Sequence, residues 1–317
     1  MKAILVPTPG GPEALVYGDA PEPAAKPGEV VVRVRAAGVN RADLLQAAGR
    51  YPPPPGASEI LGLEVAGDVE GTGERVMALL PGGGYAERVV VPSAMLLPIP
   101  RGLSYVDAAA IPEVFTTAYL DLFVEAGLAA GERVLVHAAA SGVGTAAIQL
   151  ARRAGASVVG LTRSPAKCDP IRALGAELAL YVADGGFAER IEASFGKDAV
   201  DVVLDPIGGA TLAADVRLLA PKGRLVFIAT MGGARGELDL ATVLRKRLRI
   251  IGSTLRGRPL PEKVDLMERL SRDVLPAFAD GTLRPLLDSV FPLERAAEAH
   301  HRMASNENVG KIVLELP

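Results

Sequence analysis

The chain has 317 residues, of which 49% are hydrophobic, and its 34 basic and 37 acidic residues give a formal net charge of −3. So balanced a charge argues against nucleic acid or an acidic membrane surface as a partner, and a chain of this length usually divides into two domains. The single cysteine, Cys168, excludes an internal disulfide framework and indicates a reducing compartment, so we expect a cytoplasmic protein.

The first hundred residues predict a β-rich domain. They begin with a short apolar run broken by Pro7 and Pro9, for which we expect neither a signal peptide nor a membrane anchor. Runs of β-branched residues then alternate with Pro- and Gly-rich turns, which is typical of a compact, mostly antiparallel domain. These runs are Val30–Arg35, Val65–Val69, Arg75–Leu80 and Tyr85–Val91.

A polar segment inside this domain holds the candidate catalytic residues. Asn40 can cap a short helix, and Asp43 follows in its first turn, where a carboxylate is often only a partner of the helix dipole. Tyr51 precedes four consecutive prolines, which stiffen the loop into an extended form. Tyr51, Asn40 and Asp43 are therefore the candidates, while stiffening of a surface connection is the alternative explanation of the prolines.

Residues 133–161 predict a strand, a turn, a helix and a second strand. The run Arg133–His137 suits a strand buried on both faces of a parallel sheet, and Gly155 suits the left-handed end of a helix over 145–154. The turn between them keeps one glycine of the G-x-G-x-x-G fingerprint, yet it lies where a helix N-terminus binds a pyrophosphate. An ordinary tight turn is the alternative. The candidate cofactor residues here are Ser141, Gly142, Val143 and Gly144.

The end of the second strand indicates which dinucleotide is bound. An NAD site usually carries Asp or Glu about 20 residues after the glycine turn, where it accepts a hydrogen bond from the ribose 2′-hydroxyl. This region instead holds Arg163, Ser164 and Lys167. Such a set attracts a 2′-phosphate through charge-assisted hydrogen bonds, so the sequence favours NADPH over NADH. Solvated surface charges are the alternative.

Beyond Lys167 the alternation of strands and helices continues. Further strands are predicted at 177–182, 200–204, 224–229 and 249–253. Ligands of such sheets bind beyond the carboxyl ends of the strands, which adds four candidate cofactor residues: Ile207, Gly208, Met231 and Gly232. The predicted fold is α/β, a Rossmann doubly wound parallel sheet over 116–257 plus a mostly antiparallel β catalytic domain over 1–115 and 258–317.

The last part of the chain returns to the β domain. The strand near Arg249–Leu255 predicts an apolar sheet edge, which tends to pair, unless the basic run before it shields it. Glu262–Ala279 predicts one amphipathic helix, and Leu293–Met303 a second. The second contains His300 and His301, and since adjacent residues cannot share a helix face, we expect one packed and one exposed histidine. A strand over 311–316 completes the domain.

Several motifs in order carry a specific resemblance. After Asn40, Asp43 and Tyr51 come GLEVAG, LLPGGGYAE, AAIPEVFTTAY, HAAASGVGTAAIQLA and the closing NENVGKIVLEL. This order resembles the zinc-free quinone oxidoreductases of the medium-chain dehydrogenase/reductase superfamily, in particular the subgroup that includes the tumour-suppressor-induced quinone oxidoreductase of animals. The likeness runs essentially from end to end.

The resemblance implies a GroES-like catalytic domain, an NADPH cofactor and a homodimer joined through sheet edges. It adds Thr117, Tyr181 and Asn308 to the candidate nucleotide contacts, together with Asn40. Tyr181 stands one position early in its strand, and such a shift points a side chain to the other face of a sheet.

The same resemblance implies that no zinc is bound. Zinc-dependent relatives carry a GHE motif with cysteine and histidine ligands, whereas this chain has Leu63 in place of that histidine and Asn40 in the region of a ligand cysteine. With one cysteine and three histidines, the usual catalytic ligand set cannot be assembled.

The predicted function is an NADPH-dependent quinone reductase, with hydride or electron transfer to a quinone and no metal. Tyr51 would act as a hydrogen-bond donor or weak acid, since a phenol has an ordinary pKa near 10. Reduction of the C=C bond of enones or alkenals is one alternative. An NADPH-binding structural or interaction protein with little turnover is the other.

Overall fold

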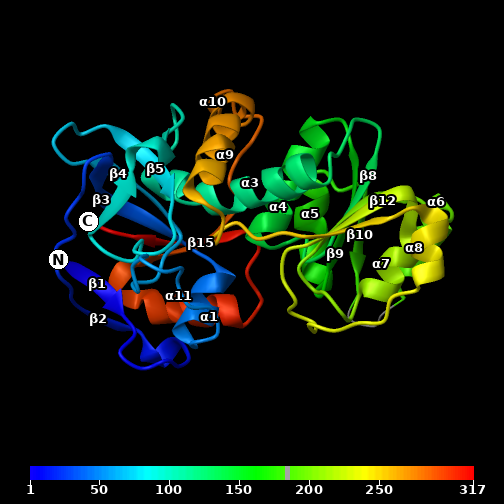
Figure 1. Cartoon of the computed structure of the whole chain (residues 1–317), viewed down its shortest axis with the longest axis horizontal. Helices are drawn as coiled ribbons and strands as arrows, with labels where there is room; N and C mark the ends of the chain where they lie inside the picture. The colour runs from blue at the N-terminus through cyan, green and yellow to red at the C-terminus, as the bar shows by residue number, and fades with distance from the viewer. Residues whose placement is uncertain (183–185) are drawn as a thin grey trace. The chain divides into compact units, whose positions relative to one another are not determined.

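The computed structural model describes residues 1–182 and 186–317, and the chain forms two compact units. One unit, here called the β-rich unit, contains Met1–Thr116 and Leu255–Pro317, and the other, the Rossmann unit, contains Thr117–Thr254. These breaks lie close to the boundaries expected at residues 115 and 257 (Figure 1). Among the described residues, no helix has the length and apolar character needed to cross a membrane.

The Rossmann unit is built on a six-stranded sheet in the order β10-β9-β8-β11-β12-β13. All five strand pairs are parallel, and this is the order of a doubly wound dinucleotide-binding sheet, as predicted. The strands are β8 (Arg133–Val136), β9 (Ser157–Thr162), β10 (Leu178–Tyr181), β11 (Val200–Asp205), β12 (Leu219–Phe227) and β13 (Arg249–Gly252).

Helices cover both faces of this sheet. Figure 1 shows α4 (Gly142–Arg153) and α5 (Cys168–Ala173) on one side of the strands. On the other side lie α6 (Phe187–Phe195), α7 (Leu212–Leu218) and α8 (Leu240–Lys246). Because side chains on both faces of the strands are buried, the strands are apolar throughout rather than alternating. Helix α4 ends at Arg153, and Gly155 just after it has a φ of +78°, the left-handed conformation that the sequence predicted there.

The β-rich unit contains a seven-stranded sheet with the path β14-β15-β3-β4-β5-β7, and β6 pairs with β3. Every pair is antiparallel except β14 with β15, so the expected mostly antiparallel sheet is confirmed. A separate pair joins β1 (Lys2–Leu5) and β2 (Val16–Asp19). The other strands are β3 (Glu29–Val39), β4 (Glu64–Val69), β5 (Arg75–Leu79), β6 (Arg88–Pro92), β7 (Leu96–Pro98), β14 (Leu287–Pro292) and β15 (Lys311–Glu315).

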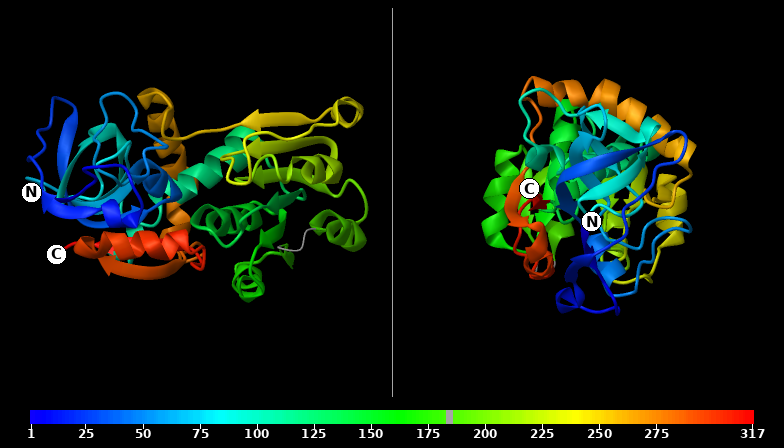
Figure 2. Two further views of the ribbon diagram at one scale, coloured as in Figure 1. Left: turned by 90° about the horizontal axis from the view of Figure 1, so that it is seen from below. Right: turned by 90° about the vertical axis from the view of Figure 1, so that its left-hand side faces the viewer.

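Short helices complete the chain. They include α1 (Arg41–Ala47), α2 (Tyr105–Ala108), α3 (Pro112–Tyr119) and the π-helical segment η3 (Leu120–Glu125). Single 3-10 turns are η1 (Pro12–Ala14), η2 (Ser93–Met95), η4 (Pro165–Lys167) and η5 (Leu293–Arg295). The C-terminal helix α11 (Ala296–Ala304) lies against η1, so the last part of the chain packs beside the first (Figure 2).

The single helix expected over 262–279 is wrong. The structure has α9 (Leu260–Asp273) and α10 (Leu275–Ala279), which are separated at Val274. Pro276 lacks a backbone N–H and clashes with the carbonyl four residues earlier, so it can occupy the first turn of a new helix but not the interior of an existing one. In α11, His300 is 1% exposed and His301 is exposed, as predicted.

Gly144 packs too closely against the chain to carry a side chain, which yields a prediction. A Cβ at this position would lie 2.6 Å from the carbonyl oxygens of Ala138 and Ala139. We expect Gly144→Ala to lower the unfolding free energy of the Rossmann unit by about 1–3 kcal/mol, as overpacking typically does. Thermal unfolding followed by circular dichroism measures this. Gly252→Ala is the control, since a Cβ there has no atom within 4 Å, and an equal loss in both variants would contradict the argument.

Candidate functional site

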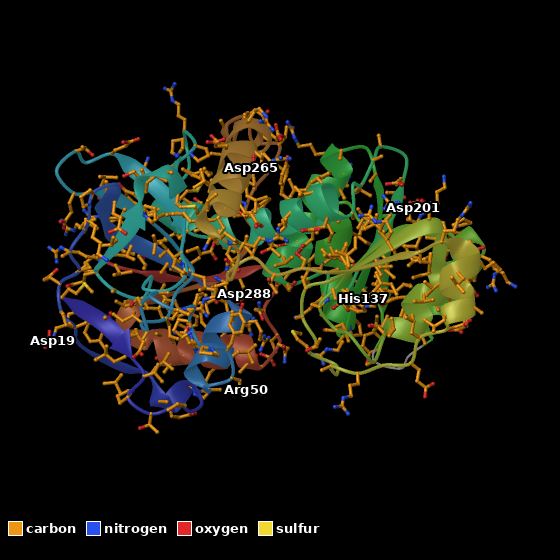
Figure 3. All side chains as sticks on the ribbon, viewed as in Figure 1. Asp19, Arg50, His137, Asp201, Asp265 and Asp288 are labelled. Carbon is orange, nitrogen blue, oxygen red and sulfur yellow. The ribbon has the colours of Figure 1, made fainter. Side chains whose placement is uncertain are left out.

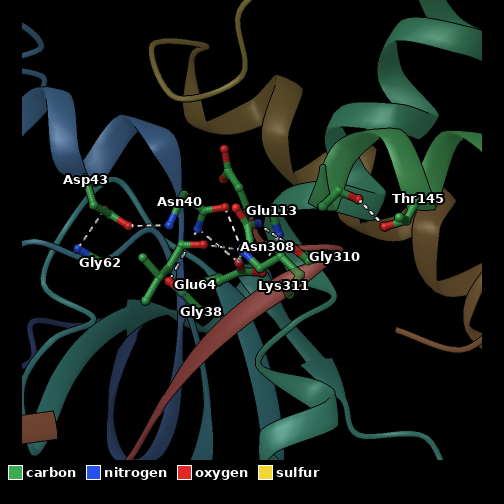
Figure 4. A network of polar contacts seen from close by, with 12 residues as sticks. Gly38, Asn40, Asp43, Gly62, Glu64, Glu113, Thr145, Asn308, Gly310 and Lys311 are labelled. Carbon is green, nitrogen blue, oxygen red and sulfur yellow. Dashed lines mark hydrogen bonds and ion pairs between the residues drawn. The ribbon is translucent and has the colours of Figure 1, made fainter. Parts of the chain in front are cut away.

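A buried polar network in the β-rich unit centres on Lys311. Its ammonium donates three hydrogen bonds, to Val39 O at 2.7 Å, to Asn40 Oδ1 at 2.7 Å and to Glu64 Oε1 at 2.6 Å. The Asn40 amide also donates to Glu64 Oε1 at 2.9 Å (Figure 4). Glu64 is fully buried and Lys311 is 3% exposed. The side chain of Asn40 is therefore held by both members of a buried ion pair.

The sheet explains why these residues meet. Lys311 begins β15 and Glu64 begins β4, and both strands are neighbours of β3, which Asn40 follows directly. Sequence reasoning missed Glu64 and Lys311. The available signal was a charged residue directly before an apolar run at the start of a strand, as in LGLEVAG and GKIVLEL, because a buried charge requires a partner.

Asp43 lies next to this network and is also fully buried. Its carboxylate accepts hydrogen bonds from Asn40 N at 2.8 Å, from Gly62 N at 3.1 Å and from the Tyr85 hydroxyl at 3.0 Å. Burial raises the pKa of Asp43 to about 6, against the effect of these donors. All three contacts stabilise the local fold, so a catalytic role for Asp43 stays a prediction.

Glu113, in the first turn of α3, was not among the candidates. Its backbone N–H donates to Glu64 Oε2 at 2.8 Å, which places its backbone next to the buried ion pair. Burial, and then the charge of Glu64, raise the pKa of Glu113 to about 8. The sequence signal was weak, since an acidic residue directly after Pro112 looks like an ordinary first-turn carboxylate.

Tyr51 is held by Arg256. The guanidinium carbon lies 5.2 Å from the centre of the phenol ring, and Arg256 also donates to Pro81 O at 2.8 Å and to Gln46 Oε1 at 2.7 Å. Burial raises the pKa of Tyr51, Arg256 opposes this, and Glu113 adds to it. The phenol is therefore a hydrogen-bond donor at neutral pH.

These side chains do not fit a zinc ion. Leu63 is buried and offers no ligand atom, and Asn40 uses its amide on Glu64 and its carbonyl oxygen on the Lys311 ammonium. Catalytic zinc needs three cysteine, histidine or carboxylate ligands, and Cys168 belongs to the other unit. The donor set is that of a hydrogen-bond network around an ammonium group.

The turn before α4 has the features of a pyrophosphate site. Ser141 caps the helix, its Oγ accepting from Gly144 N at 3.0 Å, and Ala139 is fully buried where the fingerprint has a glycine. Within the described ranges, no protein acceptor is recorded for the N–H groups of Gly142 and Val143. Such unsatisfied donors at a helix N-terminus bind anions.

Just beyond the carboxyl end of β9 lies a group of residues, here called the basic set, that consists of Arg163, Ser164 and Lys167. Arg163 is exposed and directly follows β9, and Ser164 and Lys167 belong to the turn after it. Tyr181 is paired in register with Thr162, so its side chain stands one strand away from this set. The four residues expected to contact a 2′-phosphate therefore lie at or just beyond the carboxyl ends of two neighbouring strands, and their contact with a phosphate stays a prediction.

The loops after β11 and β12 are also joined. Met231 N donates to Pro206 O at 3.1 Å, and Gly232 N donates to Ile207 O at 2.7 Å. Gly208 has a φ of +87°, which favours glycine. Ile207, Gly208, Met231 and Gly232 therefore form one rim beyond the strand ends.

The two remaining candidates lie in different units. Thr117 is half-buried in α3 and is the first residue of the Rossmann unit. Asn308 is buried in the β-rich unit and donates to Gly310 O at 3.0 Å.

One further group in the Rossmann unit combines metal-ligating residue types. His137, Asp205 and Asp215 are buried, and their ligand atoms lie within 4.8 Å of one another (Figure 3 labels His137). His137 Nε2 lies 2.7 Å from Asp215 Oδ1, and Asp205 accepts from Gly208 N at 3.1 Å and from the Thr211 hydroxyl at 2.9 Å. These contacts are those of a network that anchors strand ends and α7.

Comparisons with known proteins cover the whole chain. A family model described as "Alcohol dehydrogenase GroES-like domain" matches residues 26–101, and one described as "Zinc-binding dehydrogenase" matches residues 142–271. The quinone oxidoreductase of Lama guanicoe is 32% identical over 328 residues, which cover 100% of this chain and 98% of that protein. The quinone oxidoreductase from Thermus thermophilus, whose structures include a complex with NADPH, is 40% identical with a TM-score of 0.87, and the match covers 100% of both chains.

The chain is also similar to one portion of much longer proteins. It is 39% identical over 333 residues to the spectinabilin polyketide synthase system protein NorB of Streptomyces orinoci. That match covers 99% of this chain but only 14% of the synthase protein.

The buried ion pair gives a stability prediction. Lys311→Met leaves the Glu64 carboxylate buried without its cation, and we expect the β-rich unit to lose about 3–5 kcal/mol of unfolding free energy. Adding Glu64→Gln should recover much of this loss, because it removes the uncompensated charge. Urea denaturation followed by circular dichroism measures both variants. Lys26→Met, at an exposed lysine of the same unit, is the control; a double variant no more stable than Lys311→Met would contradict the charge argument.

The His137 pair gives a pH prediction. Burial opposes the charged imidazole, but Asp215, with a smaller contribution from Asp205, outweighs this and raises the pKa of His137 above its ordinary value of 6.5. The stability from this pair is therefore fully present below pH 6.5 and is lost as the pH rises through the raised pKa. Asp215→Asn removes the charge, so we expect the stability difference between wild type and variant to shrink from about pH 6 to more alkaline pH. Denaturation at several pH values measures it; a difference that does not change with pH would contradict the assignment.

Proposed function

This chain belongs to the medium-chain dehydrogenase/reductase superfamily, and we propose that it is an NADPH-dependent quinone reductase that works without zinc. The observation that carries the proposal is the joint presence of an anion-binding turn, a basic set beyond β9 and a buried ammonium network in place of metal ligands. The end-to-end similarity to the quinone oxidoreductase from Thermus thermophilus supports it.

The Rossmann unit supplies the cofactor contacts in this proposal. Gly142 and Val143 would donate backbone N–H groups to the pyrophosphate, with Ser141 and Gly144 shaping the turn. The 2′-phosphate would be bound by the basic set and the residue beside it: Arg163, Ser164, Lys167 and Tyr181. The rim residues would flank the rest of the dinucleotide, and Thr117, Asn40 and Asn308 would complete the contacts.

The bound cofactor supplies the hydride, and the protein supplies orientation and hydrogen bonds. Tyr51 keeps its proton at neutral pH, because the ordinary pKa of a phenol is near 10 and burial raises it further, and so Tyr51 can donate a hydrogen bond to an acceptor oxygen. Arg256 holds the Tyr51 loop in place by two contacts. It donates a hydrogen bond to the backbone oxygen of Tyr51, and its guanidinium lies over the Tyr51 ring. The rigid loop presents the phenol without the entropic cost of ordering it.

A panel of acceptors under NADPH tests the function. We expect oxidation of NADPH with ortho- and para-quinones, followed by its absorbance. Oxidation with an alkenal or enone but with no quinone would favour the second candidate, a C=C reductase, for which the match to a polyketide synthase protein is the specific observation. Binding of NADPH without turnover on any acceptor would favour a structural or interaction protein.

Charge reversal tests the choice of cofactor. We expect Lys167→Glu to weaken NADPH binding at least about tenfold, because the 2′-phosphate loses a charge-assisted hydrogen bond and meets a carboxylate, and to leave NADH binding nearly unchanged. Isothermal titration with both cofactors measures the two affinities.

The control for this experiment is Lys197→Glu, which changes an exposed lysine of the same unit that follows α6. It should alter neither affinity. Equal weakening of NADPH and NADH by Lys167→Glu would contradict the phosphate assignment.

We also propose a cytoplasmic homodimer. Strand β13 is the outer strand of its sheet, and Ile250 on it is 39% exposed, so the edge near Arg249–Leu255 is available for pairing. The thiol of Cys168 is free and buried, which suits a reducing compartment.

A further inference from the structure

We propose that Glu113 is the proton donor of the reaction, passing its carboxyl proton to the oxygen of the reduced acceptor. This inference rests on the proposed reductase function. Glu113 was not among the candidate site residues, and the two residues take different tasks: Tyr51 orients the acceptor and Glu113 protonates it.

Lys311 is one of the cations whose charge acts on Glu113, but its donors are all used by other groups. The Lys311 ammonium has three N–H donors, and these are taken by Val39 O, Asn40 Oδ1 and Glu64 Oε1. Glu64 thus has its own counter-ion, and it accepts the backbone N–H of Glu113 with its second oxygen. The Lys311 ammonium therefore has no N–H donor left for the carboxylate of Glu113.

Two further cations that act on Glu113 donate their recorded hydrogen bonds to other groups. Arg256 donates to Pro81 O, Gln46 Oε1 and Tyr51 O. Lys263 donates to Arg256 O at 3.4 Å. Within the ranges that the structure describes, no recorded hydrogen bond ends on a carboxylate oxygen of Glu113.

The direction of the Glu113 side chain agrees with this role. Figure 4 shows the Glu113 carboxylate turned away from the ion pair that its backbone contacts. The residue is only half-buried, so its proton can be replaced from water. A carboxyl group without a donor, beside a second carboxylate and partly removed from solvent, holds its proton more tightly than an exposed one.

The electrostatic surroundings agree with this geometry. Burial and Glu64 raise the pKa of Glu113 to about 8, so the carboxyl group is protonated in most of the molecules at pH 7. The charged and titratable groups that face it come from α1, β4, β15, α9 and two loops: Asp43, Glu64, Lys311, Lys263, Arg256 and Tyr51. Of these, Glu64 and Asp43 raise the pKa, and Lys311 and Arg256 lower it less than burial raises it.

The proton and electron balance is simple. The hydride from NADPH carries two electrons and one hydrogen nucleus to the acceptor, which leaves an oxygen anion on the reduced quinone and oxidises the cofactor to NADP⁺. The O–H bond of Glu113 breaks, a new O–H bond forms on that oxygen, and Glu113 becomes a carboxylate. A proton from water restores the acid. An acid with a pKa near the working pH suits this transfer.

The pH profile of turnover tests the inference. We expect kcat of the wild type, with the best quinone and saturating NADPH, to fall as the pH rises through about 8. Glu113→Gln keeps the size of the side chain but has no acidic proton. Its kcat at about pH 7 should be about 100-fold lower, and the fall of kcat at alkaline pH, the alkaline limb of the profile, should disappear. Glu113→Asp should restore part of the rate and the limb.

Two comparison variants separate chemistry from structure. Tyr51→Phe should lower the rate but keep the alkaline limb, because the acid remains. Glu268→Gln, at an exposed glutamate of α9, should change neither. NADPH affinity and thermal unfolding of Glu113→Gln should match the wild type, which a purely structural role of Glu113 would not allow.

A measurement without turnover completes the test. The infrared C=O band of a protonated carboxyl, taken as the difference between wild type and Glu113→Gln, should disappear with a midpoint near pH 8. Quinone turnover with an unchanged pH profile in Glu113→Gln, or absence of this band at neutral pH, overturns the inference alone. Absence of turnover by the wild type with every acceptor overturns the proposed function, and the inference with it.

Discussion

The buried ammonium of Lys311 is the interaction on which the rest of the β-rich unit depends. A charge removed from water is tolerated only when its partners are close and its donors are all used, and here each of the three donors has an acceptor within 2.7 Å. The acceptors belong to the end of β3, the residue after it and the start of β4. One lysine from the C-terminal strand therefore fixes the place of Asn40 and Glu64.

Burial raises the pKa of two carboxyl groups beside this network, and the charges of the network modify the effect. Asp43 and Glu113 both lie near Glu64, and burial raises the pKa of the first to about 6 and of the second to about 8. Asp43 is surrounded by donors that stabilise its charge, whereas Glu113 has none recorded among the described residues. Two neighbouring carboxyl groups thus differ in their protonation at neutral pH, a pattern that often separates a structural group from an acid.

The two units recognise charge in different ways. The Rossmann unit offers backbone N–H groups at a helix end and cations on long side chains beyond a strand. These groups suit the reversible binding of a phosphate. The β-rich unit instead holds an internal cation permanently. Asn40 uses its amide on Glu64 and its carbonyl oxygen on that ammonium, and Leu63 offers no ligand atom, so this network is held by hydrogen bonds.

The sequence by itself determined the features that are local. The β-branched runs predicted the parallel strands, Gly155 predicted a helix end, and the cations after β9 could be recognised before the fold was known. Neighbouring histidines could be divided into one buried and one exposed because helix geometry is local. The break at Val274 is local as well, since Pro276 in the following turn causes it.

Only the tertiary structure decided which distant charges meet. Glu64 and Lys311 are 247 residues apart, and nothing in either strand indicates the other, because strand order rather than sequence spacing makes them neighbours. The same holds for Glu113, whose proton affinity depends on groups from several other segments. The periodicity of a sequence indicates which side chains are buried, whereas a pKa depends on the groups around a side chain. Those groups come together only after the strands have paired.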